Sequence, residues 1–229
     1  MKVYAVTCDP ARMERLRNAA SSLNLDIEGV ESPLFTDEEV VRRGKTCFEK
    51  GTAYPTGLAA TIGHIRCMQK LVDSGDQFAI IVEDDVRFHR DFNNALPILE
   101  KYMKEHDTDI LSIGFVNLPS TTMHNITFYH GIPIVERVNV SNPWGAQCYM
   151  IRKSYAKFFT QIFSTDDLSL PYSNKFVTDH VIFDSTELYC KRASLMFPIV
   201  IESPDEQSIA GNHNKPNLLV HLKKEHFHM

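Results

Sequence analysis

Apolar and polar residues alternate along the chain in blocks that predict strands and helices in turn. The clearest strand is "FAIIV" (78–82), an apolar run typical of a strand buried on both faces of a sheet. The clearest helix covers 58–75, where apolar residues recur at helical spacing until Gly75. Further strands are expected at 2–8, 26–32, 109–116, within 127–151 and within 189–203, and further helices at 11–23, early in 36–57, at 95–106, at 154–163 and at 178–188. This alternation predicts a three-layer α/β domain.

Composition narrows the function classes. The 229 residues, 43% of them hydrophobic, suffice for one sizeable core. A formal charge of −5 gives no global field that favours nucleic acid or an anionic membrane. The five cysteines contain no C-x-x-C and indicate reduced thiols. The sequence has no apolar window of signal-peptide or membrane-span length, so we expect a cytoplasmic protein without a membrane span.

Three carboxylates, Glu83, Asp84 and Asp85, directly follow the apolar run 78–82. Ligands of open α/β sheets bind beyond the carboxyl ends of the strands. If the strand continues, Glu83 and Asp85 share one side and Asp84 points away. Two converging carboxylates are suitable ligands for a hard divalent cation that also binds phosphates. The alternative is a solvated turn with a helix cap.

Other nucleotide and acyl-transfer motifs are absent. "GKT" at 44–46 lacks the first glycine of a phosphate-binding loop, because Glu39 stands at that position. No G-x-G-x-x-G opens the first helix, and no G-x-S-x-G elbow occurs.

The segment "YPTGLAATIGHIRCMQKLVDSGDQFAIIVEDDVRFHRDF" (54–92) resembles the central signature of glycosyltransferase family 25, which includes lipopolysaccharide galactosyltransferases. That signature joins a histidine-bearing helix to an apolar strand, a Glu-Asp-Asp step and an Asp-Phe pair. Further matches follow in the family's order at "VTCDPARMERLR", "DILSIGF", "GAQCYMIRKSYAKFF", "VTDHVIFD" and "PIVIESPDEQSIAG". The sequence departs from the family at Gly63, where serine is usual, and at Thr7-Cys8, where Asn-Leu is common.

The resemblance implies a fold and a reaction. The fold is expected to be GT-A-like, a Rossmann-type α/β/α arrangement with a mixed central sheet. We expect one glycosyltransferase domain over 1–215, with a nucleotide-sugar half at about 1–115, an acceptor half at about 116–215 and a tail at 216–229. The implied reaction is metal-dependent, inverting transfer from a nucleotide-diphosphate-sugar, with UDP-sugar expected, to a hydroxyl of a glycan or saccharide, as in lipopolysaccharide biosynthesis. The implied cofactor is Mn²⁺ or Mg²⁺.

The resemblance also implies residues for the donor and the metal. Glu83 and Asp85 resemble a D-x-D element that holds the metal, and His213 is the candidate for a further ligand. The donor would be bound by Thr7, Cys8, Asp9, Arg12, His64, Glu83 and Asp84. An arginine can grip a phosphate with two donors, although Arg12 on an exposed helix face would only be solvated. The alternative for His64 is a buried histidine with a structural role, and the alternative for His213 is a loop histidine that binds no metal.

The catalytic base and the acceptor contacts are expected in the second half of the chain. Asp179 matches the family's aspartate and is the candidate base, with Glu187 and Asp205 as substitutes. The alternative for Asp179 is a carboxylate that only stabilises the first turn of a helix. Trp144 and Gly145 are the candidate acceptor contacts, because an aromatic ring packs on a sugar face. A lone tryptophan in the core is the alternative for Trp144.

Two other functions remain open at this point. One is a glycosyltransferase-like binding protein without activity, which a missing carboxylate or base would favour. The other is a metal-dependent phosphodiester or pyrophosphate hydrolase, which needs a denser carboxylate and histidine cluster for two metal ions. The sequence shows one carboxylate cluster and the late His213, which favours the transferase.

Overall fold

The computed structural model describes residues 1–51, 54–115, 126–136, 145–164, 178, 181–182 and 190–203. The strands of this part are β1 (Lys2–Thr7), β2 (Ile27–Glu31), β3 (Phe78–Glu83), β4 (Val86–Phe88), β5 (Ile110–Gly114), β6 (Ile126–Tyr129), β7 (Ile132–Glu136), β8 (Cys148–Arg152), β9 (Arg192–Leu195) and β10 (Val200–Glu202). Its helices are α1 (Pro10–Ser21), α2 (Glu38–Glu49), α3 (Pro55–Asp73), α4 (Phe92–Glu105) and α5 (Lys153–Ile162). None of these helices is both long enough and apolar enough to cross a membrane.

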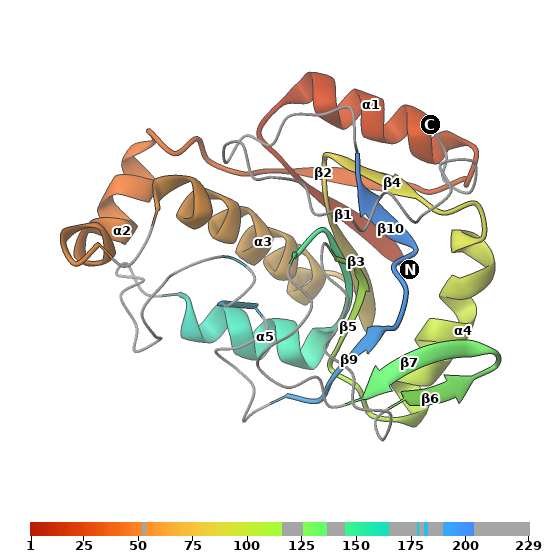
Figure 1. The fold of residues 1–229 in the computed structure, drawn as a ribbon. Helices are drawn as coiled ribbons and strands as arrows, with labels where there is room; N and C mark the ends of the chain where they lie inside the picture. The colour runs from red at the N-terminus through yellow and green to blue at the C-terminus, as the bar shows by residue number, and fades with distance from the viewer. Residues whose placement is uncertain are drawn as a thin grey trace.

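The strands form one mixed sheet, whose main path runs in the order β2-β1-β3-β8-β5-β9-β7-β6 (Figure 1). β1 lies parallel to both β2 and β3. β8 lies antiparallel between β3 and β5, so β5 has the same direction as β3. β10 pairs with the end of β5 and, antiparallel, with β4. The carboxyl ends of β1, β2, β3 and β5 therefore meet at one edge of the sheet.

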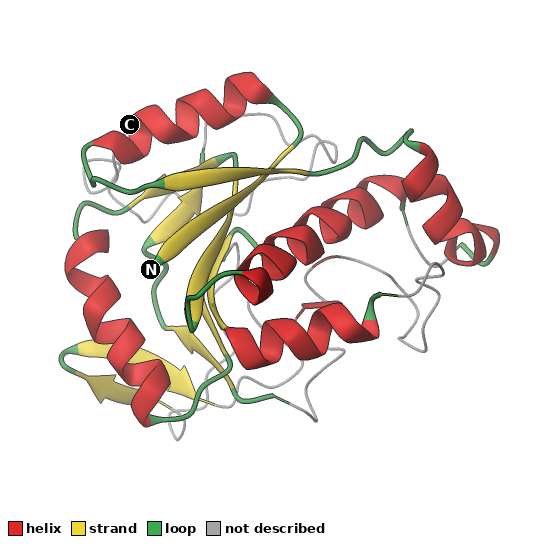
Figure 2. Cartoon of the chain, turned by 180° about the vertical axis from the view of Figure 1, so that it is seen from behind, coloured by secondary structure: helices red, strands yellow, loops and turns green. Residues whose placement is uncertain are grey.

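Helices cover both faces of the sheet, which confirms the predicted three-layer α/β arrangement (Figure 2). α2, α3 and α5 lie on one face, where Met68 and Ile81 belong to one buried cluster. α1 and α4 lie on the other face, where Leu16, Ile80 and Leu99 belong to a second buried cluster. Successive residues of β3 enter opposite clusters, as its uninterrupted apolar sequence predicts.

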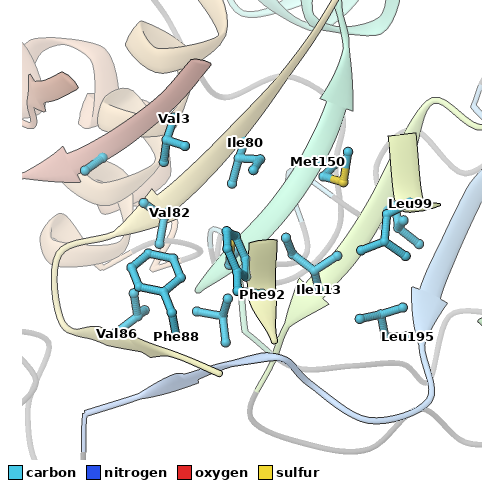
Figure 3. Packing of buried hydrophobic residues seen from close by; sticks show 14 of the residues in the cluster. Val3, Ile80, Val82, Val86, Phe88, Phe92, Leu99, Ile113, Met150 and Leu195 are labelled. Carbon is cyan, nitrogen blue, oxygen red and sulfur yellow. The ribbon is translucent and has the colours of Figure 1, made fainter. Parts of the chain in front are cut away.

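β4 is a short strand that the sequence pattern did not indicate. Its Phe88 and the nearby Phe92 are fully buried, and their rings meet edge to face with centroids 4.9 Å apart. Figure 3 shows both rings beside Val82, close to the connection from β3 to β4. Burying one such side chain stabilises the fold by about 1.5–3 kcal/mol. These phenylalanines hold in place the chain that follows the three carboxylates.

Two predicted helices begin about one turn earlier than expected. The helix expected at 58–75 starts at Pro55, because proline is favourable at the first helical position. The helix expected at 95–106 starts at Phe92. Most of the helix expected at 178–188 lies outside the described residues.

Gly63 allows α3 to approach β1 closely. A Cβ atom at this position would lie 2.5 Å from Val6 Cγ1 and 2.9 Å from both Cβ and Oγ of Ser32. The Ser32 hydroxyl is itself engaged, because it donates to the carbonyl of Ala59. The serine that is usual at position 63 in the resembled family does not fit this packing unless Val6, Ser32 or the helix shifts.

We expect Gly63→Ser to destabilise the protein by about 1–3 kcal/mol, because it overpacks the contact between α3 and β1. The free energy of unfolding in urea measures the effect. Gly75→Ala is the matched control, since a Cβ there would meet nothing within 4 Å. Equal stability of Gly63→Ser and wild type would show that the close approach is no constraint.

Candidate active site

The site is built where three parallel strands end. Val6 of β1 pairs with Glu83 of β3, and Thr7 pairs with Glu31 of β2. Beyond them, the backbone N–H of Ser32 donates to the carbonyl of Thr7 at 2.7 Å and ties the two strand ends together. The chain ends that follow β1, β2 and β3 are thereby held side by side.

A cleft of about 180 Å³ opens at this edge. Its walls are the segments that follow β1, β2 and β3 together with the first turns of α1 and α3. The predicted site residues that line it are Thr7, Cys8, Arg12, Glu83, Asp84 and Asp85. Residues distant in the sequence are thus brought together, as expected for ligands bound beyond the strand ends. We call this the edge cleft.

Arg12 is the positive charge that faces the aspartates. Asp9 caps α1, since its Oδ1 accepts from the N–H of Ala11 at 2.8 Å, and Arg12 follows in the first turn. Only 8% of Arg12 is exposed, so the solvated alternative is wrong. Its Nη1 lies 3.4 Å from Asp84 Oδ1 and 3.7 Å from Asp85 Oδ2. The Thr7 hydroxyl also donates to Asp84 Oδ2, at 2.6 Å.

The predicted division of the carboxylates is wrong. Glu83 and Asp85 were expected on one side and Asp84 on the other, but both aspartates reach Arg12 and Glu83 turns towards His64 on α3. The reason is that the extended strand ends at Glu83. Asp84 and Asp85 form the turn into β4, where the twofold alternation of side chains no longer applies.

Asp85 is a buried acid in a negative environment. Only 9% of it is exposed, and this burial is the main reason why its pKa is raised from 3.8 to about 8. The negative charges of Glu83, Glu202 and Asp84 raise the pKa further, whereas the positive charge of Arg12 lowers it. Its Oδ1 is buried, and no described residue forms a hydrogen bond with it. A cation that reached this oxygen would stabilise the charged form of the carboxylate.

Other predicted residues have different surroundings. Burial raises the pKa of the Cys8 thiol, so the side chain that lines the cleft is a neutral thiol. His64 is fully buried and does not line the cleft, so its expected contact with a donor can only be indirect. Gly145 has a φ of 120°, and a Cβ there would lie 1.8 Å from Gln147 Oε1, so glycine is required. The backbone carbonyl of Gln147 accepts a hydrogen bond from the N–H of Glu83. Gly145 is therefore close in sequence to a residue that contacts the first of the three carboxylates.

Several predicted residues lie outside the described part of the chain. They are Asp179, His213 and Trp144, with the substitute bases Glu187 and Asp205. Thr178, which precedes the candidate base, is described and buried. Its hydroxyl donates to the carbonyl of Gly57, and Thr61 donates to it in turn. The chain at Thr178 is therefore anchored to the first turns of α3, which also contribute to the cleft.

Sequence reasoning missed three residues of this region. Leu34 and Phe35 line the cleft although about half of each side chain is exposed, 48% in Phe35. Their signal was an apolar pair in a loop directly after a strand. Glu202 acts on Asp85 from the end of β10. Its signal was the same as that of Glu83, a carboxylate that closes an apolar strand.

A sequence model of glycosyltransferase family 25, described as LPS biosynthesis protein, matches residues 56–174. The chain belongs to this family. The match covers α3, the three carboxylates and β8, and the α/β/α layers around a mixed sheet are those of the expected GT-A-like fold. This glycosyltransferase has no match among curated proteins.

Three solved structures that are similar to this glycosyltransferase have low sequence identity to it. A glycosyltransferase involved in the glycosylation of the major capsid of PBCV-1 is 7% identical, with 90% of this chain and 93% of that chain covered and a TM-score of 0.44. A197 from STIV is 11% identical, with 93% and 100% covered and a TM-score of 0.48. UDP-glucose pyrophosphorylase complexed with UDP-glucose is 9% identical, with 86% and 73% covered and a TM-score of 0.43.

The raised pKa of Asp85 predicts that its contribution to the stability of the folded protein depends on pH. Above about pH 4 the unfolded chain releases this proton while the folded chain keeps it up to about pH 8, so the stability contributed by Asp85 falls over that range. Asp85→Asn cannot ionise. We expect its stability relative to wild type to rise by about 1–3 kcal/mol between about pH 5 and about pH 8.

Urea unfolding in the presence of a chelator measures this difference. Asp26→Asn is the control, because Asp26 is an exposed acid in a surface ion pair with Lys2. A difference between Asp85→Asn and wild type that stays constant with pH would contradict the raised pKa.

Proposed function

We propose that this glycosyltransferase is a metal-dependent, inverting enzyme that uses a nucleotide-diphosphate-sugar. A UDP-sugar is the expected donor, and a hydroxyl of a glycan or saccharide is the expected acceptor. The observation that supports this most is the edge cleft, where Asp84 and Asp85 meet Arg12, Glu83 lies beside them, and the buried Asp85 Oδ1 has no hydrogen-bond partner among the described residues.

The carboxylates are suited to a divalent cation. In the described part of the chain, no group of three or more His, Cys, Asp or Glu side chains is arranged to hold a metal ion. Asp85 and Glu83 nevertheless offer the hard oxygen atoms that Mn²⁺ or Mg²⁺ prefers, and His213, outside the described residues, is the proposed further ligand. Such an ion supplies charge neutralisation to a diphosphate leaving group.

The chain's own residues would bind and orient the donor. The end of β1, with Thr7 and Cys8, and the apolar wall of Leu34 and Phe35 are suited to the nucleoside. Arg12 lies within the same cleft and carries donors for a phosphate oxygen. The cleft excludes much of the solvent around Arg12 and Asp85, which strengthens their electrostatic interactions with a bound group.

Transfer with inversion needs a base on the acceptor side. In the proposed step Asp179 takes the proton of the acceptor hydroxyl, and the oxygen of that hydroxyl forms a bond to the anomeric carbon of the donor sugar. The bond from that carbon to the diphosphate oxygen breaks, and the electron pair leaves with the diphosphate. Attack from the face opposite the leaving group inverts the configuration. Trp144 and Gly145 are proposed to place the acceptor sugar for this attack.

The test is nucleotide release from a panel of UDP- and GDP-sugars, with and without Mn²⁺ and with saccharide acceptors. We expect Mn²⁺-dependent release from one donor, reduced at least about 100-fold in Asp85→Asn because a metal ligand is lost. Asp26→Asn is the matched control on the protein surface and should retain wild-type activity.

The other outcomes separate the alternatives. Metal-dependent binding of a nucleotide-sugar without release, even with acceptors present, would indicate an inactive binding protein. Cleavage of phosphodiesters or nucleotide diphosphates without sugar transfer would indicate a hydrolase. Absence of both binding and release with every donor would overturn the assignment of the edge cleft.

A further inference from the structure

Two buried polar side chains lie behind Glu83, on the face of the sheet that α3 and α5 cover. His64 Nε2 lies 3.5 Å from Glu83 Oε1. On the other side of the imidazole, Nδ1 lies 3.0 Å from the hydroxyl of Tyr149 on β8, and the two rings stack with centroids 5.7 Å apart. Both side chains are fully buried, and Glu83 is partly exposed to the edge cleft. The three residues form a line from the core to the cleft.

The sheet creates this line from distant parts of the chain. His64 and Tyr149 are 85 residues apart in the sequence, and Glu83 comes from a third element, β3. β3 pairs antiparallel with β8, so that Ile81 faces Tyr149 across the ladder. Alternation along β3 then places Glu83 on the same face of the sheet as Tyr149, which is the face that α3 covers.

The contacts with Tyr149 and Glu83 together favour the tautomer of His64 that carries its proton on Nε2. Burial raises the pKa of Tyr149 well above its usual value, so the hydroxyl keeps its proton. When that hydroxyl donates to Nδ1, the imidazole carries its own proton on Nε2, which faces Glu83. The other tautomer would turn the lone pair of Nε2 towards a carboxylate, which is electrostatically unfavourable.

We propose that His64 is a positioning residue that holds the Glu83 carboxylate in the orientation the donor requires, with Tyr149 fixing the imidazole. At 3.5 Å the contact is longer than a good hydrogen bond, and a small movement of the partly exposed Glu83 closes it when a ligand binds. Buried partners that orient a ligating or substrate-binding carboxylate are a general requirement of such sites. This inference rests on the proposed function, because it needs Glu83 to contact the donor or its metal.

Two substitutions of His64 separate positioning from packing. The amide nitrogen of Gln can replace Nε2 and donate to Glu83, whereas that of Asn replaces only Nδ1 and faces Tyr149. We expect His64→Gln to bind the nucleotide-sugar with Mn²⁺ within about 3-fold of wild type, and His64→Asn to bind it about 10-fold more weakly. Calorimetric titration measures the dissociation constant, and urea unfolding of the same samples measures stability.

A tyrosine pair provides the second measurement. Tyr149→Phe removes the hydroxyl that fixes His64, and we expect donor binding about 3- to 10-fold weaker. Tyr155→Phe is the matched control, because Tyr155 is buried in the same cluster and its hydroxyl donates to the carbonyl of Ile182. Both variants should lose about 1 kcal/mol of stability from the missing hydrogen bond, but only Tyr149→Phe should weaken donor binding.

The outcomes distinguish this inference from the proposed function. If wild type binds and releases a donor but the two His64 variants bind it equally, the positioning role is overturned. If either His64 variant fails to fold, the tyrosine pair decides, and equal donor binding by Tyr149→Phe and Tyr155→Phe overturns the role. If wild type binds no nucleotide-sugar, the proposed function fails and the role of His64 fails with it.

Discussion

The repulsion among three successive carboxylates at the end of a buried strand is the constraint on which the site depends. Like charges repel strongly where water is largely excluded, and Asp84 and Asp85 are both buried. The guanidinium of Arg12 compensates part of this charge, and its place is set by the cap at Asp9 that starts α1. The first strand and helix of the chain therefore place the positive charge that stabilises the acidic turn after β3.

The sequence predicted the layers and the edge at which the site lies, because these follow from local patterns. An apolar run such as "FAIIV" determines its own burial, and a carboxylate after it must lie at the strand end. The partition of Glu83, Asp84 and Asp85 could not be predicted, since it depends on where the extended strand stops. β4 was missed because a strand of three residues has too few positions for a pattern.

Contacts between distant segments were also beyond local patterns. The line from Tyr149 through His64 to Glu83 exists because β8 inserts antiparallel next to β3, an order that no single segment encodes. Glu202 reaches Asp85 because β10 pairs with β4, which the sequence did not indicate at all. Pairing order in a mixed sheet arises from the packing of the whole domain, so residues that meet through it stay hidden in the sequence.

The carboxylates at the end of β3 have different contacts on the two faces of the sheet. On the α1 side, Arg12 and Thr7 hold Asp84 by charge and by a short hydrogen bond. On the α3 side, Glu83 faces the buried pair of His64 and Tyr149, which can orient it. Asp85, at the turn between them, keeps an oxygen without a partner among the described residues, and there a cation has most to stabilise. The three carboxylates are therefore not interchangeable, because their surroundings differ. Arg12 and Thr7 both contact Asp84, Asp85 is near Arg12 without the threonine, and Glu83 is near His64.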